Sequence, residues 1–149
     1  ILFDADVDAT LSRLQTILAA QNGGCTIVRG EGEKAEDSCT HTLPFVTAHG
    51  RFSFVVQNAC AQLPVATLQH ALDALLKEPQ GISIDYVHGE DVVAEIGAKE
   101  GNIGFFLPPM DKNGLFPSVV GEGALVRKTF SMGEANEKRY YLECRCLVK

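Results

Sequence analysis

The sequence predicts an α+β domain: a mixed β-sheet of about six or seven strands with helices packed on it, including βαβ units. Two segments, 6–24 and 63–81, carry apolar residues at helical spacing. Other apolar runs are short, rich in β-branched and aromatic residues, and bounded by glycine, proline or polar residues. Strand-like and helix-like segments alternate over residues 82–123, which favours βαβ units and a partly parallel sheet.

The first predicted helix lies within residues 6–24. Its apolar positions are Leu11, Leu14, Ile17 and Leu18. Asp6 or Asp8 can cap its start, and the Asn-Gly-Gly run at 22–24 can end it.

A short strand at 25–30 and a polar loop at 31–41 follow the first helix. Residues 43–56 are typical of a β-hairpin, with His49 and Gly50 supplying the tight turn.

The second predicted helix, within 63–81, has the clearest pattern. Pro64 suits its first position, and Pro79 and Gly81 can end it. One apolar stripe contains Val65, Leu68, Leu72, Leu75 and Leu76.

The second half of the chain alternates in character. We expect a strand at 82–87, a short helix at 89–101, a strand buried on both faces at 103–109, a short helix at 110–123 and a half-exposed strand at 138–148.

The composition sets limits on function. The chain of 149 residues has the size of one domain, 1–149, and its net charge of −6 disfavours nucleic acid and anionic membranes as partners. No apolar run has transmembrane length, and no signal-peptide pattern opens the sequence, so we expect a cytoplasmic protein. The apolar opening at Ile1 indicates a C-terminal fragment of a longer protein.

The five cysteines cannot all pair within one chain, and reduced thiols are expected. A zinc site formed by Cys39, His41, Cys144 and Cys146 is the alternative. Its C-x-H and C-x-C spacings differ from the usual C-x2-C knuckle, so we expect neither a metal nor another cofactor.

Residues 126–141 raise the main functional question. Arg127, Lys128, Thr129 and Ser131 are donors, with no acid between Glu122 and Glu134. A P-loop is excluded, since Arg127 and Glu122 stand where its two glycines should be. The segment is therefore either a looser anion site or a polar turn between two strands.

His88 is the second candidate site residue. It lies where a strand end leads into a helix start, a place that often holds ligands in α/β sheets. The alternative is a loop histidine beside a helix that Asp91 caps.

Residues 85–143 resemble the C-terminal part of the bacterial domain-of-unknown-function family "DUF ten-fifteen". The resemblance is most specific over 86–92, 104–112 and 123–143. Other branches of that family have Lys-Ser-Thr-aromatic where this chain has Lys128, Thr129, Phe130 and Ser131. The family's upstream motif is similar to one in ParB-like nucleotide binders and related free serine kinases, which implies that phosphate chemistry belongs to an upstream domain of the same polypeptide.

Three functions remain open from the sequence. The first is an accessory or ligand-binding domain of a larger protein, with a small anionic ligand. The second is half of an enzyme acting on a small phosphorylated or nucleotide substrate, with Arg127, Lys128 and Thr129 holding the anion and His88 assisting. The third is a structural oligomerisation module.

Overall fold

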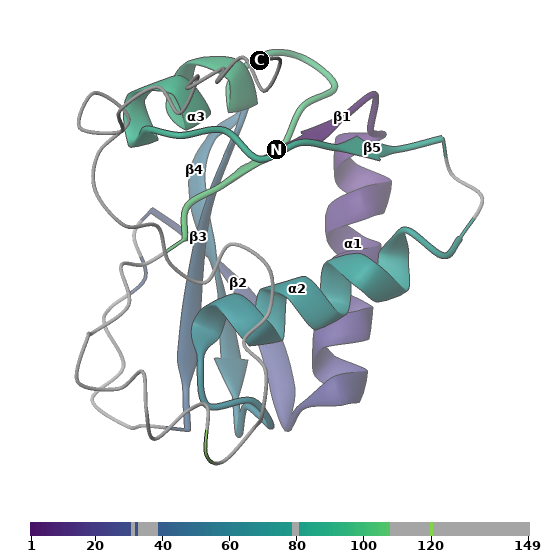
Figure 1. The fold of residues 1–149 in the computed structure, drawn as a ribbon, viewed down its shortest axis with the longest axis vertical. Coiled ribbons are helices and arrows are strands. Elements are labelled where there is room, and N and C mark those ends of the chain that lie inside the picture. The colour runs from purple at the N-terminus through teal and green to yellow at the C-terminus, as the bar shows by residue number, and fades with distance from the viewer. Residues whose placement is uncertain (31, 33–38, 79–80, 108–119, 121–149) are drawn as a thin grey trace, which may run out of the picture.

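The computed structural model describes residues 1–30, 32, 39–78, 81–107 and 120 (Figure 1). The elements in chain order are β1 (Leu2–Phe3), α1 (Val7–Gln21), β2 (Gly24–Arg29), β3 (His41–Thr47), β4 (Gly50–Gln57), α2 (Pro64–Leu75), β5 (Ser83–Ile84), α3 (Glu90–Gly97) and β6 (Gly104–Phe105). Three helices packed on β-sheets confirm the α+β class.

The described strands form two antiparallel sheets. One has two strands in the order β1-β5, and the other has four in the order β2-β4-β3-β6. The expected parallel pairing in βαβ units is therefore wrong for these strands. The chain after α3 returns beside β3 in the opposite direction, pairing Phe45 with Phe105 and Val46 with Gly104.

Both long helices start where their sequences predict; α1 also ends as predicted, whereas α2 ends at Leu75, before Pro79 and Gly81. Asp6 caps α1, and its Oδ1 accepts a hydrogen bond of 3.2 Å from the backbone N of Ala9. At the other end, Asn22 Nδ2 donates to the Leu18 carbonyl at 2.8 Å. Pro64 occupies the first turn of α2, where its missing N–H costs nothing.

The hairpin is confirmed, but its turn is one residue earlier than expected. Thr47 pairs with Gly50, so Ala48 and His49 form the loop. Gly50 is the first residue of β4 and has φ 118°, a conformation that a side chain would make costly.

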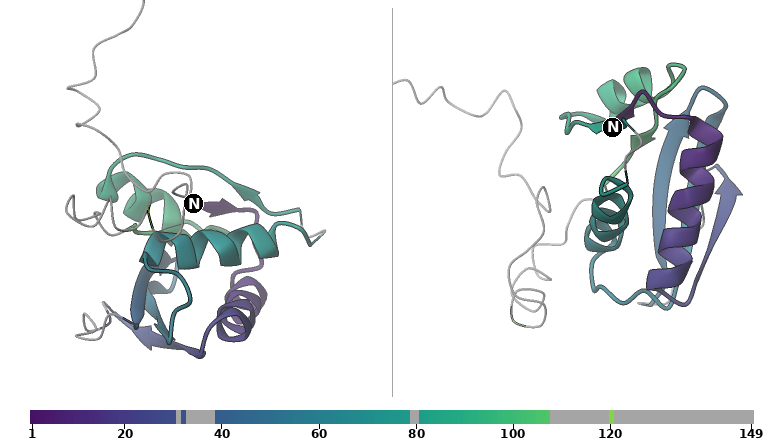
Figure 2. Two further views of the ribbon diagram at one scale, coloured as in Figure 1. Left: turned by 60° about the horizontal axis from the view of Figure 1, so that its bottom comes forward. Right: turned by 90° about the vertical axis from the view of Figure 1, so that its right-hand side faces the viewer.

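The helices α1 and α2 cover one face of the four-stranded sheet (Figures 1 and 2). Alternation along the strands sends Leu43 and Phe45 of β3 and Phe54 and Val56 of β4 toward this face, and all four are buried. Phe45 stacks on Phe54 with ring centroids 4.8 Å apart, and it also contacts the rings of Phe52 and Phe105. We call this side the helix face.

The opposite face has less helical cover. α3 packs on it where β3 meets β6, and a methyl group at Gly97 would lie 2.8 Å from both Gly104 Cα and Val46 Cγ1. Antiparallel strands often bury only one face. In β6 both residues are buried, because the core covers Phe105 and α3 covers Gly104. We call this side the open face.

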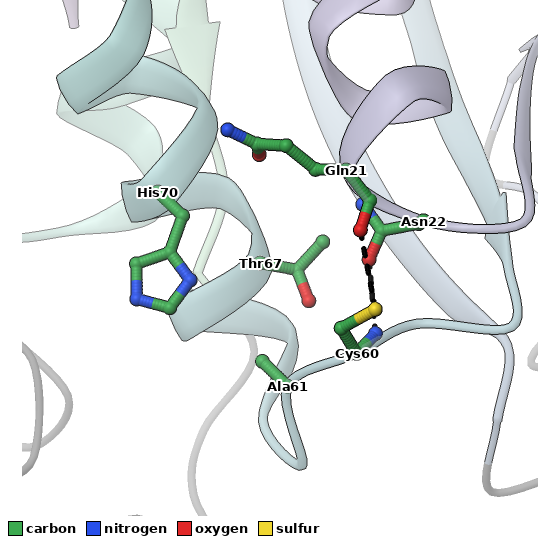
Figure 3. Close-up of a pocket in the computed structure, with 6 residues that line it drawn as sticks. All are labelled: Gln21, Asn22, Cys60, Ala61, Thr67 and His70. Atoms are coloured by element: carbon green, nitrogen blue, oxygen red, sulfur yellow. Dashed lines mark hydrogen bonds between the residues drawn. The ribbon is translucent and has the colours of Figure 1, made fainter.

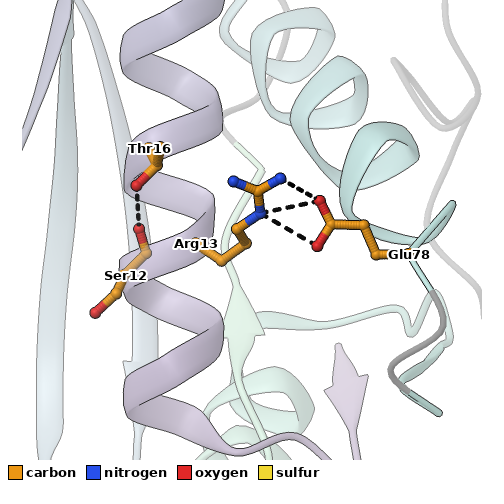
Figure 4. Close-up of polar contacts among 4 residues, drawn as sticks. All are labelled: Ser12, Arg13, Thr16 and Glu78. Carbon is orange, nitrogen blue, oxygen red and sulfur yellow. Dashed lines mark hydrogen bonds and ion pairs between the residues drawn. The ribbon is translucent and has the colours of Figure 1, made fainter.

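An exposed ion pair links α1 to the segment after α2 (Figure 4). Arg13 Nε donates to both carboxylate oxygens of Glu78, at 2.9 and 3.1 Å, and Nη2 donates to one of them. These hydrogen bonds raise the pKa of Arg13. The pair is open to solvent, so salt should weaken its contribution.

Candidate functional site

His88 is placed where the sequence predicts, between β5 and α3, and its side chain is exposed. It does not line the hollows described below. The expected cap at Asp91 is wrong. Gly89 is the N-cap, with φ 97°, so α3 begins at Glu90 and Asp91 lies within its first turn.

The other predicted site residues, Arg127, Lys128, Thr129 and Ser131, lie outside the described residues. The expected helix at 110–123 falls almost wholly outside them, and the strand at 138–148 does so entirely. Cys144 and Cys146 are likewise not described, so the zinc alternative is not tested. Within the described ranges, no three His, Cys, Asp or Glu side chains form a group that could hold a metal ion.

A hollow of about 260 Å³ lies between the end of α1 and the start of α2 (Figure 3). We call it the Cys60 pocket, and its lining residues are Gln21, Asn22, Cys60, Ala61, Thr67 and His70. His70 and Thr67 come from α2, and Gln21 ends α1. A thiol, an imidazole and a hydroxyl therefore share one hollow, which the sequence did not indicate.

Hydrogen bonds within the protein occupy several of these groups. The Cys60 thiol donates to the Gln21 carbonyl at 3.1 Å, and the backbone N of Cys60 donates to Asn22 Oδ1 at 2.9 Å. Thr67 Oγ1 is 2.9 Å from Nδ1 of His41, whose ring is buried behind it. The hydrogen bonds of Cys60 join the segment before α2 to the end of α1. The polar groups of the Cys60 pocket thus contribute to holding α1 and α2 together.

A larger hollow of about 340 Å³ lies on the open face. We call it the Arg51 groove. It is lined by Gly30, Gly32, Thr42, Pro44, Phe45, Arg51, Phe52, Glu90, Phe106 and Leu107. A second hollow of about 160 Å³ shares Glu90, Phe106 and Leu107 with it, so the concave region continues along the start of α3.

Arg51 and Phe106 define the character of the Arg51 groove. The guanidinium carbon of Arg51 is 5.0 Å from the centroid of the Phe106 ring, which is a cation–π contact. This contact holds the positive charge of Arg51 against the aromatic ring. The groove therefore combines an apolar, aromatic wall with one oriented cation.

Gly30 and Gly32 contribute backbone to the lining of the groove, and Ser53 holds them in place. Ser53 Oγ donates to the Gly30 carbonyl at 2.9 Å and accepts from the Gly32 backbone N at 3.1 Å. Ser53 is fully buried, and a methyl group at Gly32 would lie 3.1 Å from Thr42 Cγ2. Glycine at 32 thus lets this segment lie close against the sheet.

Volume favours the Arg51 groove over the Cys60 pocket as the binding site. Small-molecule sites are concave, mostly apolar and roughly 300–1,000 Å³ in volume, with a few polar groups that fix orientation. The Arg51 groove falls within this range, and the Cys60 pocket is below it.

Comparisons with known proteins do not indicate a function for this chain. No protein-family model, no curated protein and no solved structure matches this chain. Among the helices that the structure describes, none is long and apolar enough to cross a bilayer.

Sequence reasoning missed the Arg51 groove because its parts are distant along the chain. Arg51 begins a hairpin strand, and Phe106 follows β6. The one available signal was period-two alternation, which places Arg51 on the face opposite Phe52 and Phe54. Nothing in the sequence indicates that Phe106 would meet it there.

Proposed function

We propose that this chain is a ligand-binding domain, and that the Arg51 groove takes a small molecule with an aromatic or apolar body and one anionic group. The observation that supports this is the guanidinium of Arg51 stacked on Phe106 beside an apolar hollow of about 340 Å³. The ring system of the ligand would lie on the apolar wall, and its anionic group would accept N–H donors from Arg51.

The charges around the groove favour a singly charged ligand. Glu90 lines the same hollow, and Asp91 follows it in the first turn of α3. Both carboxylates complement the positive end of that helix dipole. They would also repel each further negative charge on a ligand, as would the net charge of −6. An aromatic carboxylate fits this balance better than a phosphate dianion.

We further propose that the domain is accessory to a larger bacterial, cytosolic protein. This rests on the resemblance of residues 85–143 to the "DUF ten-fifteen" family, whose phosphate-related motif lies upstream. In this arrangement the present domain binds a ligand and completes or regulates the upstream domain.

The test is a thermal-shift screen followed by calorimetry on the 149-residue chain. The probes are aromatic carboxylates, their uncharged amides and the corresponding aryl phosphates. We expect the carboxylates to raise Tm, because a ligand that binds the folded state stabilises it. The amides should bind more weakly because they give Arg51 no charged partner.

Two substitutions with the same change in charge provide the matched comparison. Arg51→Gln should weaken carboxylate binding about tenfold to a hundredfold, the effect of losing one charge-assisted contact. Arg13→Gln, on α1, should leave the affinity unchanged. If no carboxylate binds, or if both variants bind as tightly as the unmodified chain, the proposal fails.

A second candidate is a phosphate site at residues 127–131, favoured by the run of donors without an intervening acid. It corresponds to half of an enzyme acting on a phosphorylated substrate. Aryl phosphates would then bind. Lys128→Ala would lower the affinity for aryl phosphates roughly tenfold or more, and Arg51→Gln would leave that affinity unchanged. Equal phosphate affinity in the unmodified chain and in Lys128→Ala would exclude this site.

A further inference from the structure

The strand β2 lies at one end of the four-stranded sheet, so one of its two edges has no neighbouring strand among the described elements (Figures 1 and 2). Its pairing with β4 shows which backbone groups point to that free edge. The backbone N of Gly30 donates to the Arg51 carbonyl at 2.9 Å, and Gly30 with Arg51 continues the register of the two strands.

Hydrogen-bonded and non-hydrogen-bonded pairs alternate in an antiparallel ladder. Since Gly30 is hydrogen-bonded to β4, the N–H and C=O groups of Thr26 and Val28 also point to β4. Those of Cys25, Ile27 and Arg29 consequently point outward, to the free edge. The Cys25 carbonyl already accepts a hydrogen bond of 3.0 Å from Gln15 Nε2.

As far as the described residues show, this edge lacks most of the features that prevent strands from pairing with other chains. Natural edges are blunted by proline, bulges, charged residues or very short length. β2 has six residues, Gly24–Arg29, contains no proline, pairs residue for residue with β4, and has one charged residue at its end. Ile27 is 37% exposed, the largest exposure of any apolar side chain in the strand.

We propose that two copies of this chain associate through β2, antiparallel and centred on Ile27. In this register Ile27 faces Ile27 of the second copy, and Cys25 faces Arg29. Every outward-pointing residue of one strand then meets an outward-pointing residue of the other, as a hydrogen-bonded ladder requires. The result is a continuous sheet of eight strands, four from each copy.

The charges support a second copy as the occupant of the edge. Arg29 is the only charged residue of β2, and two-fold pairing about Ile27 places it opposite Cys25 and away from the other Arg29. Gln15 is compatible with this, since a carbonyl oxygen has two lone pairs and can accept from Gln15 and from the Arg29 N–H of the second copy. Strand-to-strand contacts are smaller than the interfaces of stable dimers, so the association should be reversible.

The experiment is sedimentation of the 149-residue chain over a wide concentration range, with circular dichroism to check folding. The unmodified chain should show a reversible monomer–dimer equilibrium. Ile27→Pro removes an outward-pointing N–H from each copy and should weaken dimerisation about tenfold or more while leaving the fold intact. Val28→Pro is the matched control. It removes an inward-pointing N–H and should destabilise the monomer.

A charge exchange tests the register itself. Ile27→Lys and Ile27→Glu should each be monomeric, because like charges would face each other across the two-fold axis. Mixing the two variants should restore a dimer. The proposal is overturned if the unmodified chain stays monomeric at all concentrations, if Ile27→Pro dimerises as strongly, or if the mixture does not associate. None of these substitutions is in the Arg51 groove, so its ligand affinity is an independent readout.

Discussion

The two faces of the four-stranded sheet are made from the same strands but differ in what covers them. On the helix face, α1 and α2 enclose Phe45, Phe54 and their apolar neighbours, and the exposed fraction of both rings is 0%. On the open face, α3 covers the part around Val46, and Arg51 and Phe106 border a hollow beside it. Incomplete cover leaves room for a ligand, so stability should depend mainly on the helix face and binding on the open face.

The largest expected effect comes from removing one aromatic ring from each face. Phe54→Ala should lower the free energy of unfolding by about 3–5 kcal/mol, because it leaves a cavity in a closed core. Phe106→Ala should cost about 1 kcal/mol, since its ring is only partly buried, and yet it should abolish the carboxylate response. Urea denaturation and calorimetry on both variants measure the two effects. Similar stability losses in the two variants would show that the faces do not differ as described.

A second substitution tests how α3 is seated on the open face. Gly97→Ala would place a methyl group 2.8 Å from the backbone of Gly104. Overpacking of this kind typically costs about 1–3 kcal/mol. Because Glu90 starts the same helix and lines the Arg51 groove, a shift of α3 should also weaken ligand binding.

Glu95→Ala is the control in α3, since that side chain is exposed and a smaller side chain introduces no clash. Chemical denaturation and ligand titration of both variants provide the comparison. Unchanged stability in Gly97→Ala would mean that α3 does not pack as closely as the structure indicates.

The third prediction examines the border of the helix face at Cys25. Burial raises the pKa of its thiol from 9.0 to about 11. The folded state therefore disfavours the thiolate, and this contribution to stability is fully present below pH 9.0 and is lost as the pH rises through about 11.

Comparison with Cys25→Ala isolates the effect of this thiol from other groups that titrate in alkali. The difference in unfolding free energy between the unmodified chain and Cys25→Ala should shift in favour of the variant across that window. A difference that stays constant with pH would show that the thiol at the edge of the helix face is fully solvated.

The helix face could be predicted from the sequence because its signals are local. Helical spacing, the Asp6 cap and Pro64 determine where α1 and α2 lie, and β-rich alternation predicts the hairpin. The open face depends on contacts between distant segments. After α3 the chain runs antiparallel beside β3, where Phe105 contacts Phe45, and chain order alone favoured the wrong, parallel alternative.

Hydrophobic periodicity also could not predict the shortest strands. β1, β5 and β6 have two residues each, fewer than a period-two pattern needs to be detected. The start of α3 depends on Gly89 at φ 97°, a backbone conformation that the acidic residues after it do not reveal. The same limit applies to the candidate binding residues. His88 could be identified from its position between a strand and a helix, whereas the contact between Arg51 and Phe106 could not be inferred from the sequence.

The most direct test of the central claim is a titration of the isotopically labelled chain with an aromatic carboxylate, followed by amide chemical shifts. If the ligand binds on the open face, the largest shifts occur at Gly30, Gly32, Thr42, Arg51 and Phe106, with little change at helix-face residues that do not line the Arg51 groove. Shifts centred on Cys60, Thr67 and His70, or no shifts at saturating ligand, would contradict the assignment of binding to the open face.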